Sequence, residues 1–273
     1  MEHPNFHRQA VLLALSVPIA AWIALMPPIP QSLAYHDFAD HRTLFGIRHF
    51  WNVISNLPFA VIGLAGCWWL LRTGKNSGSL VEPWERSAYF VFFFAEFLTC
   101  FGSAYYHANP NNQTLVWDRS VFILLLAAFF PVIVTEFVHR RAGQWLLAPL
   151  VLLALASVLY WRQTGDLRLY VLIQGYPVLA IPVIFLLFRS RYTHTGAQLL
   201  AWALFAVAKL CEFFDVSIYQ LTGVWSGHTF KHFVAAAATY AVLYGLQGRA
   251  ECDAPNKSES SRNAIFQMKG LAS

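Results

Sequence analysis

Five polar residues have types and spacings that could build a metal centre with catalytic groups beside it. They are Ser103, His107, Asp118, His228 and His232. The set contains two pairs separated by four residues, Ser-x3-His and His-x3-His, and residues at this spacing share one face of a helix. Three imidazoles with a fourth position left to water are typical of catalytic zinc, whereas structural zinc sites have four protein ligands. The pattern therefore predicts zinc held by the three histidines.

The composition places these residues in a membrane protein. Hydrophobic residues make up 57% of the 273-residue chain and charged residues only 12%, whereas soluble domains have about 25% charged residues. The net charge of +5 does not indicate nucleic-acid binding, because the lysines and arginines lie in short segments between apolar runs. Ionisable groups at the ends of such runs are costly and indicate a functional site by default.

Eight apolar runs are long enough to cross a bilayer whose hydrocarbon core is about 30 Å thick. They cover residues 9–26, 50–71, 88–106, 117–138, 145–160, 170–188, 197–216 and 228–246. We therefore predict an all-α, polytopic membrane helical bundle. Residues 1–28 form an uncleaved N-terminal transmembrane helix, 29–49 a polar loop, 50–248 the core, and 249–273 a polar, disordered tail.

The order of the spans brings the polar residues to one side of the membrane. The five motif residues lie at the end of the third span and at the starts of the fourth and eighth, and Asp37 and Asp40 lie between the first two. Counting spans puts all of them on the same face. The loops on the other face hold Arg72, Lys75, Arg86, Arg140, Arg141, Arg189 and Arg191. Basic loops are typically cytoplasmic, so we expect cytoplasmic N- and C-termini and a site near the opposite face.

At the motif residues the chain resembles the alkaline ceramidase family, within a superfamily of membrane hydrolases that includes the progestin and adipoQ receptors. The shared pattern is matched by SAYYH at Ser103–His107, by Asp118 and by HTFKH at His228–His232; FWNVISNLPF at Phe50–Phe59 is similar to the family's first core helix. The resemblance covers about residues 37–246. The family core has seven spans, so the first run would be an additional N-terminal helix, as in bacterial-type members.

The resemblance implies a zinc-dependent hydrolase of linear amides that cleaves ceramide-like lipids to a sphingoid base and a fatty acid, a role in sphingolipid metabolism. Its lipid substrate would enter from the bilayer. Asp118 would accept the water proton and pass it to the leaving amine, and Ser103 would donate to the oxyanion or orient the water. The exact lipid, the chain length, amide versus ester preference and the oligomeric state stay open.

A calcium site in the polar loop is a further implication of the resemblance, with Asp37 and Asp40 as two of its ligands. Calcium prefers six to eight oxygen ligands. Arg42 and His49 stand about where further oxygen ligands would be needed. The alternative is that Arg42 or Arg48 forms ion pairs with the two aspartates.

Three other function classes stay open at this point. The chain could be a zinc-containing receptor or lipid-binding protein without turnover, a membrane haem protein that uses the paired histidines, or a transporter. We expect Glu96 and Lys209 to form an ion pair between helices, and Lys231 to point away from the metal. Glu212 and Asp215 are candidates to accept the second N–H of a ligating imidazole.

Overall fold

The computed structural model describes residues 6–74 and 78–252. Three parts of the predictions lie outside the described residues: the first five residues of the N-terminal segment, Lys75 of the basic loop, and residues 253–273 of the polar tail. The described part of the chain is helical and contains no strand.

Eight long helices coincide with the eight predicted runs. They are α1 (Phe6–Leu25), α3 (Leu57–Arg72), α4 (Pro83–Ala108), α5 (Asn112–Ile133), α6 (Ala142–Thr164), α7 (Arg168–Leu187), α8 (Gly196–Phe213) and α10 (Gly227–Gly248). Four short helices complete the described chain: a 3-10 helix (Leu33–His36), α2 (Phe50–Ile54), a π-helix (Val134–Val138) that continues α5, and α9 (Asp215–Thr222).

Six helical segments in the described chain are long and apolar enough to cross a membrane: Phe50–Arg72, Pro83–Ala108, Asn112–Val138, Ala142–Thr164, Arg168–Leu187 and Gly196–Phe213. This confirms an all-α polytopic bundle. Helices α1 and α10 have 20 and 22 residues, about 30 Å at the helical rise. Their length suits the two remaining spans, which stay a prediction.

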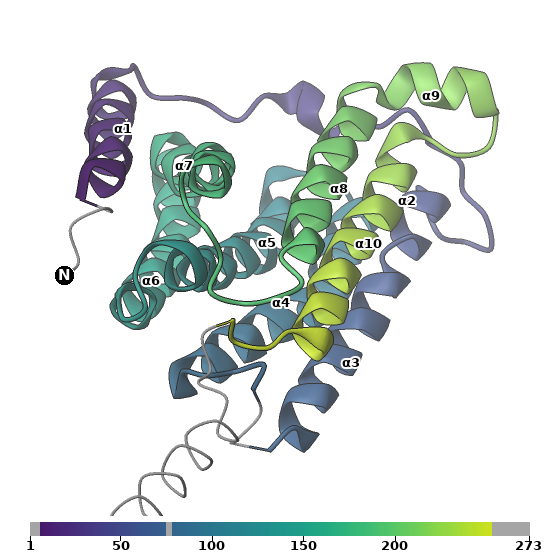
Figure 1. The fold of residues 1–273 in the computed structure, drawn as a ribbon. Helices are drawn as coiled ribbons and strands as arrows, with labels where there is room; N and C mark the ends of the chain where they lie inside the picture. The colour runs from purple at the N-terminus through teal and green to yellow at the C-terminus, as the bar shows by residue number, and fades with distance from the viewer. Residues whose placement is uncertain (1–5, 75–77, 253–273) are drawn as a thin grey trace, which may run out of the picture.

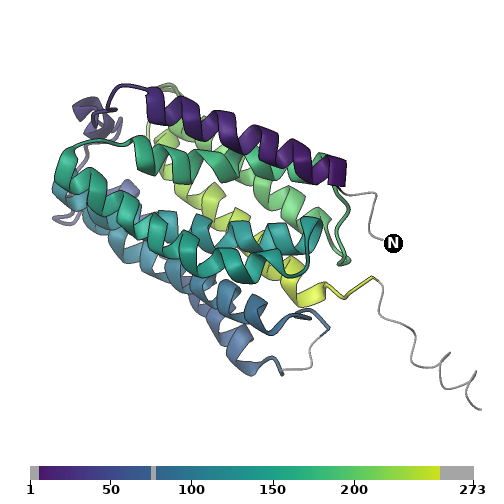
Figure 2. The same cartoon turned by 90° about the vertical axis from the view of Figure 1, so that its left-hand side faces the viewer.

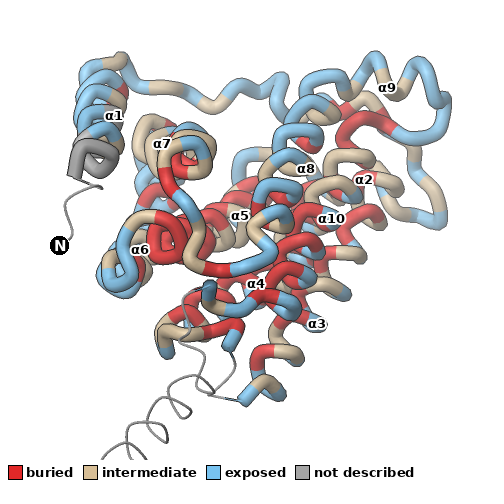
Figure 3. Tube along the Cα trace, viewed as in Figure 1, coloured by how far each residue is buried: buried red, intermediate tan, exposed pale blue. Residues whose placement is uncertain are grey.

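Helices α4, α5 and α10 form the centre of the bundle, and the others surround them (Figures 1 and 2). Buried residues concentrate on these three helices in Figure 3, whereas α1, α6 and α9 expose most of their surface. Helix α1 packs against α7, where the Ser16 and Tyr176 hydroxyls lie 2.7 Å apart. In a bilayer, apolar side chains on the outer helices would face acyl chains.

The predicted convergence of helix ends is visible in Figure 2. The end of α4 and the starts of α5 and α10 lie at the end of the bundle that is crossed by the segment 29–49. The start of α1 and the end of α10 lie at the opposite end. The cytoplasmic location of the termini stays a prediction.

Two spans are interrupted near this end. The second predicted span breaks into α2 and α3 just before Pro58, because proline lacks the amide hydrogen and clashes with the carbonyl four residues earlier. The seventh was expected to reach Val216, but α8 ends at Phe213 and α9 starts at Asp215. The chain turns there because the Asp215 carboxylate accepts bonds from the backbone of two other segments.

Two glycines allow α3 to approach α4 closely. A Cβ atom at Gly63 would lie 2.4 Å from the Phe97 backbone nitrogen, and one at Gly66 would lie 2.2 Å from the Phe93 ring. Small residues at such contacts let helix backbones pack without voids, which is a main source of association in lipid. The contact fixes α2 and α3 beside the end of α4 that carries His107.

A buried ionic network closes the end of the bundle opposite the motif residues. The Arg249 guanidinium donates to Glu136 Oε2 at 2.9 Å and to Glu85 Oε1 at 3.4 Å. It also donates to the Tyr89 hydroxyl, and Tyr192 donates to Glu85 at 2.8 Å. Arg249, Glu136 and Glu85 are all buried. The network joins the end of α10 to α4, to the π-helix and to the α7–α8 connection.

We predict that Arg249→Met lowers the free energy of unfolding by about 3 to 5 kcal/mol, because two buried carboxylates lose their cation. Chemical unfolding of the protein in detergent micelles measures this. Arg189→Met is the matched control, since Arg189 is exposed and its loss should change stability little. Equal effects of the two substitutions would contradict the role of the network.

Candidate metal centre

The three predicted histidine ligands converge in the structure. His107 comes from the last turn of α4, and His228 and His232 come from the first two turns of α10. All three are buried, and one ring nitrogen from each lies within 4.8 Å of the others. Among the described residues this is the one group of at least three histidine, cysteine or acidic side chains placed to hold a metal.

The distances fit zinc. The Nε2 atoms of His107 and His228 lie 3.2 Å apart. Two nitrogens bound to one tetrahedral zinc at about 2.0–2.1 Å would lie about 3.3 Å apart. Two neutral imidazoles that share a hydrogen bond would have a similar separation. The third ring, His232, is what distinguishes a metal site from such a pair. A set of three imidazoles is a donor set that zinc prefers.

Residues of α2 and of the break that follows it hold the α10 histidines in place. The Ser55 hydroxyl lies 2.8 Å from His232 Nδ1, which leaves the Nε2 side of that ring for the metal. Asn52 accepts hydrogen bonds through Oδ1 from Ser226 at 3.3 Å and Thr229 at 2.9 Å. Asn52 and Ser55 are fully buried. They belong to the FWNVISNLPF segment, but the sequence alone did not assign them these roles.

Phe38, in the loop that crosses this end, covers two of the imidazoles. Its ring centroid lies 4.7 Å from that of His107 and 4.6 Å from that of His228, and the side chain is buried. An apolar ring in this position limits the access of water from outside the bundle. The polar loop therefore contributes an apolar cover to the candidate centre.

The acidic residues of α8 and α9 do not accept imidazole N–H groups as expected. Asp215 accepts from the backbone amide of His228 at 2.7 Å and from that of Ala39 at 2.9 Å. Glu212 forms ion pairs with Lys209 and Lys231. Asp215 thus fixes the start of α10 and the loop through their backbones.

Ser103 and Asp118 lie together beside the histidines. Both line a cavity of about 280 Å³ that His232 also lines, and the two side chains are close enough to interact electrostatically. Lys231 lines the same cavity and pairs with Glu212 at 2.9 Å; the prediction that it points away from the metal stays a prediction. Its position follows from the rotation of α10, which the spacing of the histidines alone did not reveal.

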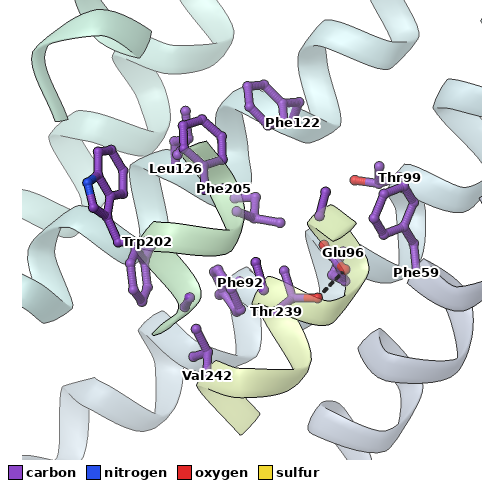
Figure 4. Close-up of a pocket in the computed structure, with 15 residues that line it drawn as sticks. Phe59, Phe92, Glu96, Thr99, Phe122, Leu126, Trp202, Phe205, Thr239 and Val242 are labelled. Atoms are coloured by element: carbon purple, nitrogen blue, oxygen red, sulfur yellow. Dashed lines mark hydrogen bonds between the residues drawn. The ribbon is translucent and has the colours of Figure 1, made fainter. Parts of the chain in front are cut away.

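An apolar cavity of about 90 Å³ lies beside the polar one, between α4, α5, α8 and α10 (Figure 4). The two share Phe59, Thr99, Phe122, Phe205 and Ala235 in their walls. Along α10 the residues that line the two cavities extend from His232 to Val242, ten residues or about 15 Å at the helical rise. We call the apolar cavity the apolar column.

Glu96 lies in the wall of this apolar cavity and does not pair with Lys209. Thr239 on α10 donates to Glu96 Oε1 at 2.6 Å (Figure 4). Lys209 instead pairs with Glu212 on its own helix. The predicted ion pair between Glu96 and Lys209 is therefore wrong, because α8 turns Lys209 toward the polar cavity and its exposed mouth.

The two aspartates proposed for calcium have other partners. Arg42 donates to both carboxylate oxygens of the buried Asp40, at 2.7 and 2.8 Å. Asp37 is exposed and lies 3.4 Å from His41. This ion pair engages the two Asp40 oxygens that calcium would need. At Asp40 the structure therefore agrees with the alternative, an ion pair with Arg42. His49, whose pKa is lowered by burial, offers ring nitrogens and no oxygen ligand.

Comparison of the chain with protein-family models gives no match, and comparison with curated proteins gives none either. The ceramidase resemblance therefore rests on the motif residues alone. What the structure adds is their arrangement, with the three imidazoles grouped and with Ser103 and Asp118 in the wall of one adjoining cavity.

We predict that Ser55→Ala lowers zinc affinity about 10- to 100-fold, since groups that orient ligating imidazoles typically have effects of this size. Competition with a zinc chelator measures it on the purified protein. Ser87→Ala is the matched control, because Ser87 is exposed on α4. Unchanged affinity in Ser55→Ala would contradict the orienting role of the hydroxyl.

Proposed function

We propose that the chain is an intramembrane, zinc-dependent amide hydrolase that cleaves the N-acyl bond of ceramide-like lipids. One observation carries the proposal: three buried imidazoles lie beside a cavity that Ser103 and Asp118 line and that shares its walls with the apolar column. Polar chemistry at one end and an apolar channel below it suit an amphipathic substrate. The products would be a sphingoid base and a fatty acid.

His107, His228 and His232 would hold the zinc. When bound, zinc supplies a Lewis acid and a water of much lowered pKa, the combination that metal-dependent hydrolases use. Asp118 lines the cavity next to this position and can take a proton from the attacking water and return it to the leaving amine nitrogen. The amine then leaves neutral, and the carboxyl end of the acyl chain stays in the cavity until it is released.

Ser103 supplies a hydroxyl one helical turn before His107. It lines the same cavity as Asp118, where it would interact with the carboxylate and supply a donor to the reacting carbonyl. Removing a single donor of this kind from an acyl-transfer site typically costs about 10² to 10³ in rate. The hydroxyl thus serves either to position Asp118 or to stabilise the developing oxyanion.

The geometry weighs against two of the alternatives. A haem held on both faces by the paired histidines would have its ring plane between them, whereas the ring centroids of His228 and His232 are only 4.9 Å apart and both rings group with His107. A transporter path through Glu96 and Lys209 is not supported either, because Glu96 faces an apolar cavity. A zinc-containing receptor or lipid-binding protein would share the same geometry, and the test of turnover separates it from a hydrolase.

Metal analysis of the purified protein, together with product detection on a panel of N-acyl lipids, tests the proposal. We predict that His228→Ala loses both zinc and turnover. Asp118→Asn should keep zinc and lose about 10²- to 10⁴-fold in kcat, the usual contribution of a general acid–base group. Zinc with no turnover of any amide or ester lipid would favour the receptor class, and a wild-type rate in Asp118→Asn would remove the proton-transfer role.

We further predict that Ala238→Phe raises KM for long-chain N-acyl substrates and leaves short-chain substrates unaffected. Ala238 is buried in the wall of the apolar cavity, so a phenyl ring there would shorten the column. Ala237→Phe is the matched control, since the neighbouring alanine is exposed. Kinetics on a series of acyl chain lengths measure the effect, and equal behaviour of both variants would show that the chain binds elsewhere.

A further inference from the structure

Arg119, the residue after Asp118 on α5, is a buried guanidinium without an acidic partner among the described residues. Its exposed fraction is 7%, and it takes part in none of the ion pairs of the described chain. Nη2 donates to Gln31 Oε1, whereas the buried Nη1 has no hydrogen-bond partner in the described part of the chain. Burying a charge whose N–H donors are unpaired costs free energy. A ligand that accepts a hydrogen bond from Nη1 would reduce this cost.

Aromatic rings fix the guanidinium in place. Its carbon lies 4.2 Å from the ring centroid of Trp161, 4.8 Å from that of Tyr170 and 5.7 Å from that of Tyr35. Cation–π contacts stabilise the charge, but they leave the N–H donors in the guanidinium plane free. The result is an ordered fork with an unpaired donor, and such forks bind carboxylates or phosphates.

The guanidinium belongs to the same cavity as the candidate catalytic residues. Arg119 lines the 280 Å³ cavity together with Ser103, Asp118 and His232. Asp118 lines the cavity beside Ser103 of α4, whereas Arg119 packs toward α6 and α7 through Trp161 and Tyr170. A ligand in the cavity can therefore contact Arg119 on one side and the metal centre on the other.

The other charges of the cavity do not supply the missing anion. Lys209 and Lys231 share Glu212 as their partner. Asp118 attracts Arg119 through space, but the two form no ion pair or hydrogen bond among the described residues. Three cationic and two acidic side chains line the cavity, which leaves an excess of positive charge. An anionic ligand would balance this excess at Arg119.

We propose that Arg119 binds an oxyanion, a carboxylate or phosphate, carried by the lipid in this cavity. The oxyanion comes either from the substrate's headgroup or from the carboxylate of the released fatty acid. The assignment to a substrate or product rests on the proposed hydrolase function, but the binding site itself does not. In the headgroup case the substrate is an acidic N-acyl lipid rather than neutral ceramide.

Direct binding tests the site without any turnover. The probes are hexadecyl phosphate, palmitate and neutral monopalmitoylglycerol, titrated calorimetrically into purified protein in neutral detergent. We expect the wild type to bind the anionic probes about 10- to 100-fold more tightly than the neutral one, the range for hydrogen bonds to charged groups. Arg119→Gln should abolish this preference, and Arg119→Lys should keep part of it because the charge stays but the fork is lost.

Arg48→Gln is the matched control, because it removes one exposed positive charge near the same end of the bundle without touching the cavity. It should keep the full preference. A wild type that does not distinguish anionic from neutral probes overturns the proposal, even if Arg119→Gln fails to fold. A preference that survives in a folded Arg119→Gln protein overturns it as well.

Turnover then identifies the source of the anion. N-palmitoylethanolamine and its phosphate ester form a neutral and acidic substrate pair. If the headgroup is the ligand, Arg119→Gln raises KM about 10- to 100-fold for the phosphate ester alone. If the product carboxylate is the ligand, the variant instead weakens inhibition by palmitate and leaves both KM values alone. If neither substrate reacts, the result counts against the hydrolase function. The binding experiment would still decide whether Arg119 binds an oxyanion.

Discussion

A polar group inside a lipid-embedded bundle must find its partner within the protein, because hydrocarbon offers none. This constraint explains where polar side chains lie in the chain. They gather at the two ends of the bundle, and the stretch between them is lined almost entirely by apolar residues, with the Glu96–Thr239 pair as an exception. The central helices α4, α5 and α10 carry both groups and so connect the two ends.

The two polar ends differ in how completely their charged groups are paired. At the end near Arg249, the guanidinium and both carboxylates are bonded to one another and to tyrosine, serine and glutamine side chains, although Thr135 Oγ1 and Gln198 Oε1 lack partners among the described residues. At the histidine end, His107 Nδ1, Asn52 Nδ2 and Arg119 Nη1 lack partners among the described residues. A paired network stabilises a fold, whereas unpaired buried groups in a native structure call for a ligand, ion or water.

The two cavities give the histidine end its chemical character. The polar cavity lies beside the metal ligands, and the apolar column shares its walls. An amphipathic molecule could place its apolar chain in the column and its amide group beside the candidate catalytic residues. Each part would then lie in surroundings of matching polarity. The anionic preference proposed at Arg119 would then distinguish lipids by headgroup, and the column would distinguish them by chain.

The sequence alone determined the helices and the end of the bundle where the site lies. Apolar runs of sufficient length predict spans, counting spans assigns Ser103, His107, Asp118, His228 and His232 to one face, and the spacing of four residues orients each pair. It did not determine the contacts of Glu96, Lys231, Asp40 or Arg119, or the supporting role of Ser55. Those depend on the rotation of each helix about its axis. In a membrane bundle the lipid-facing and protein-facing sides are both apolar, so hydrophobic periodicity does not mark the inner face, and only tertiary packing decides which polar groups meet.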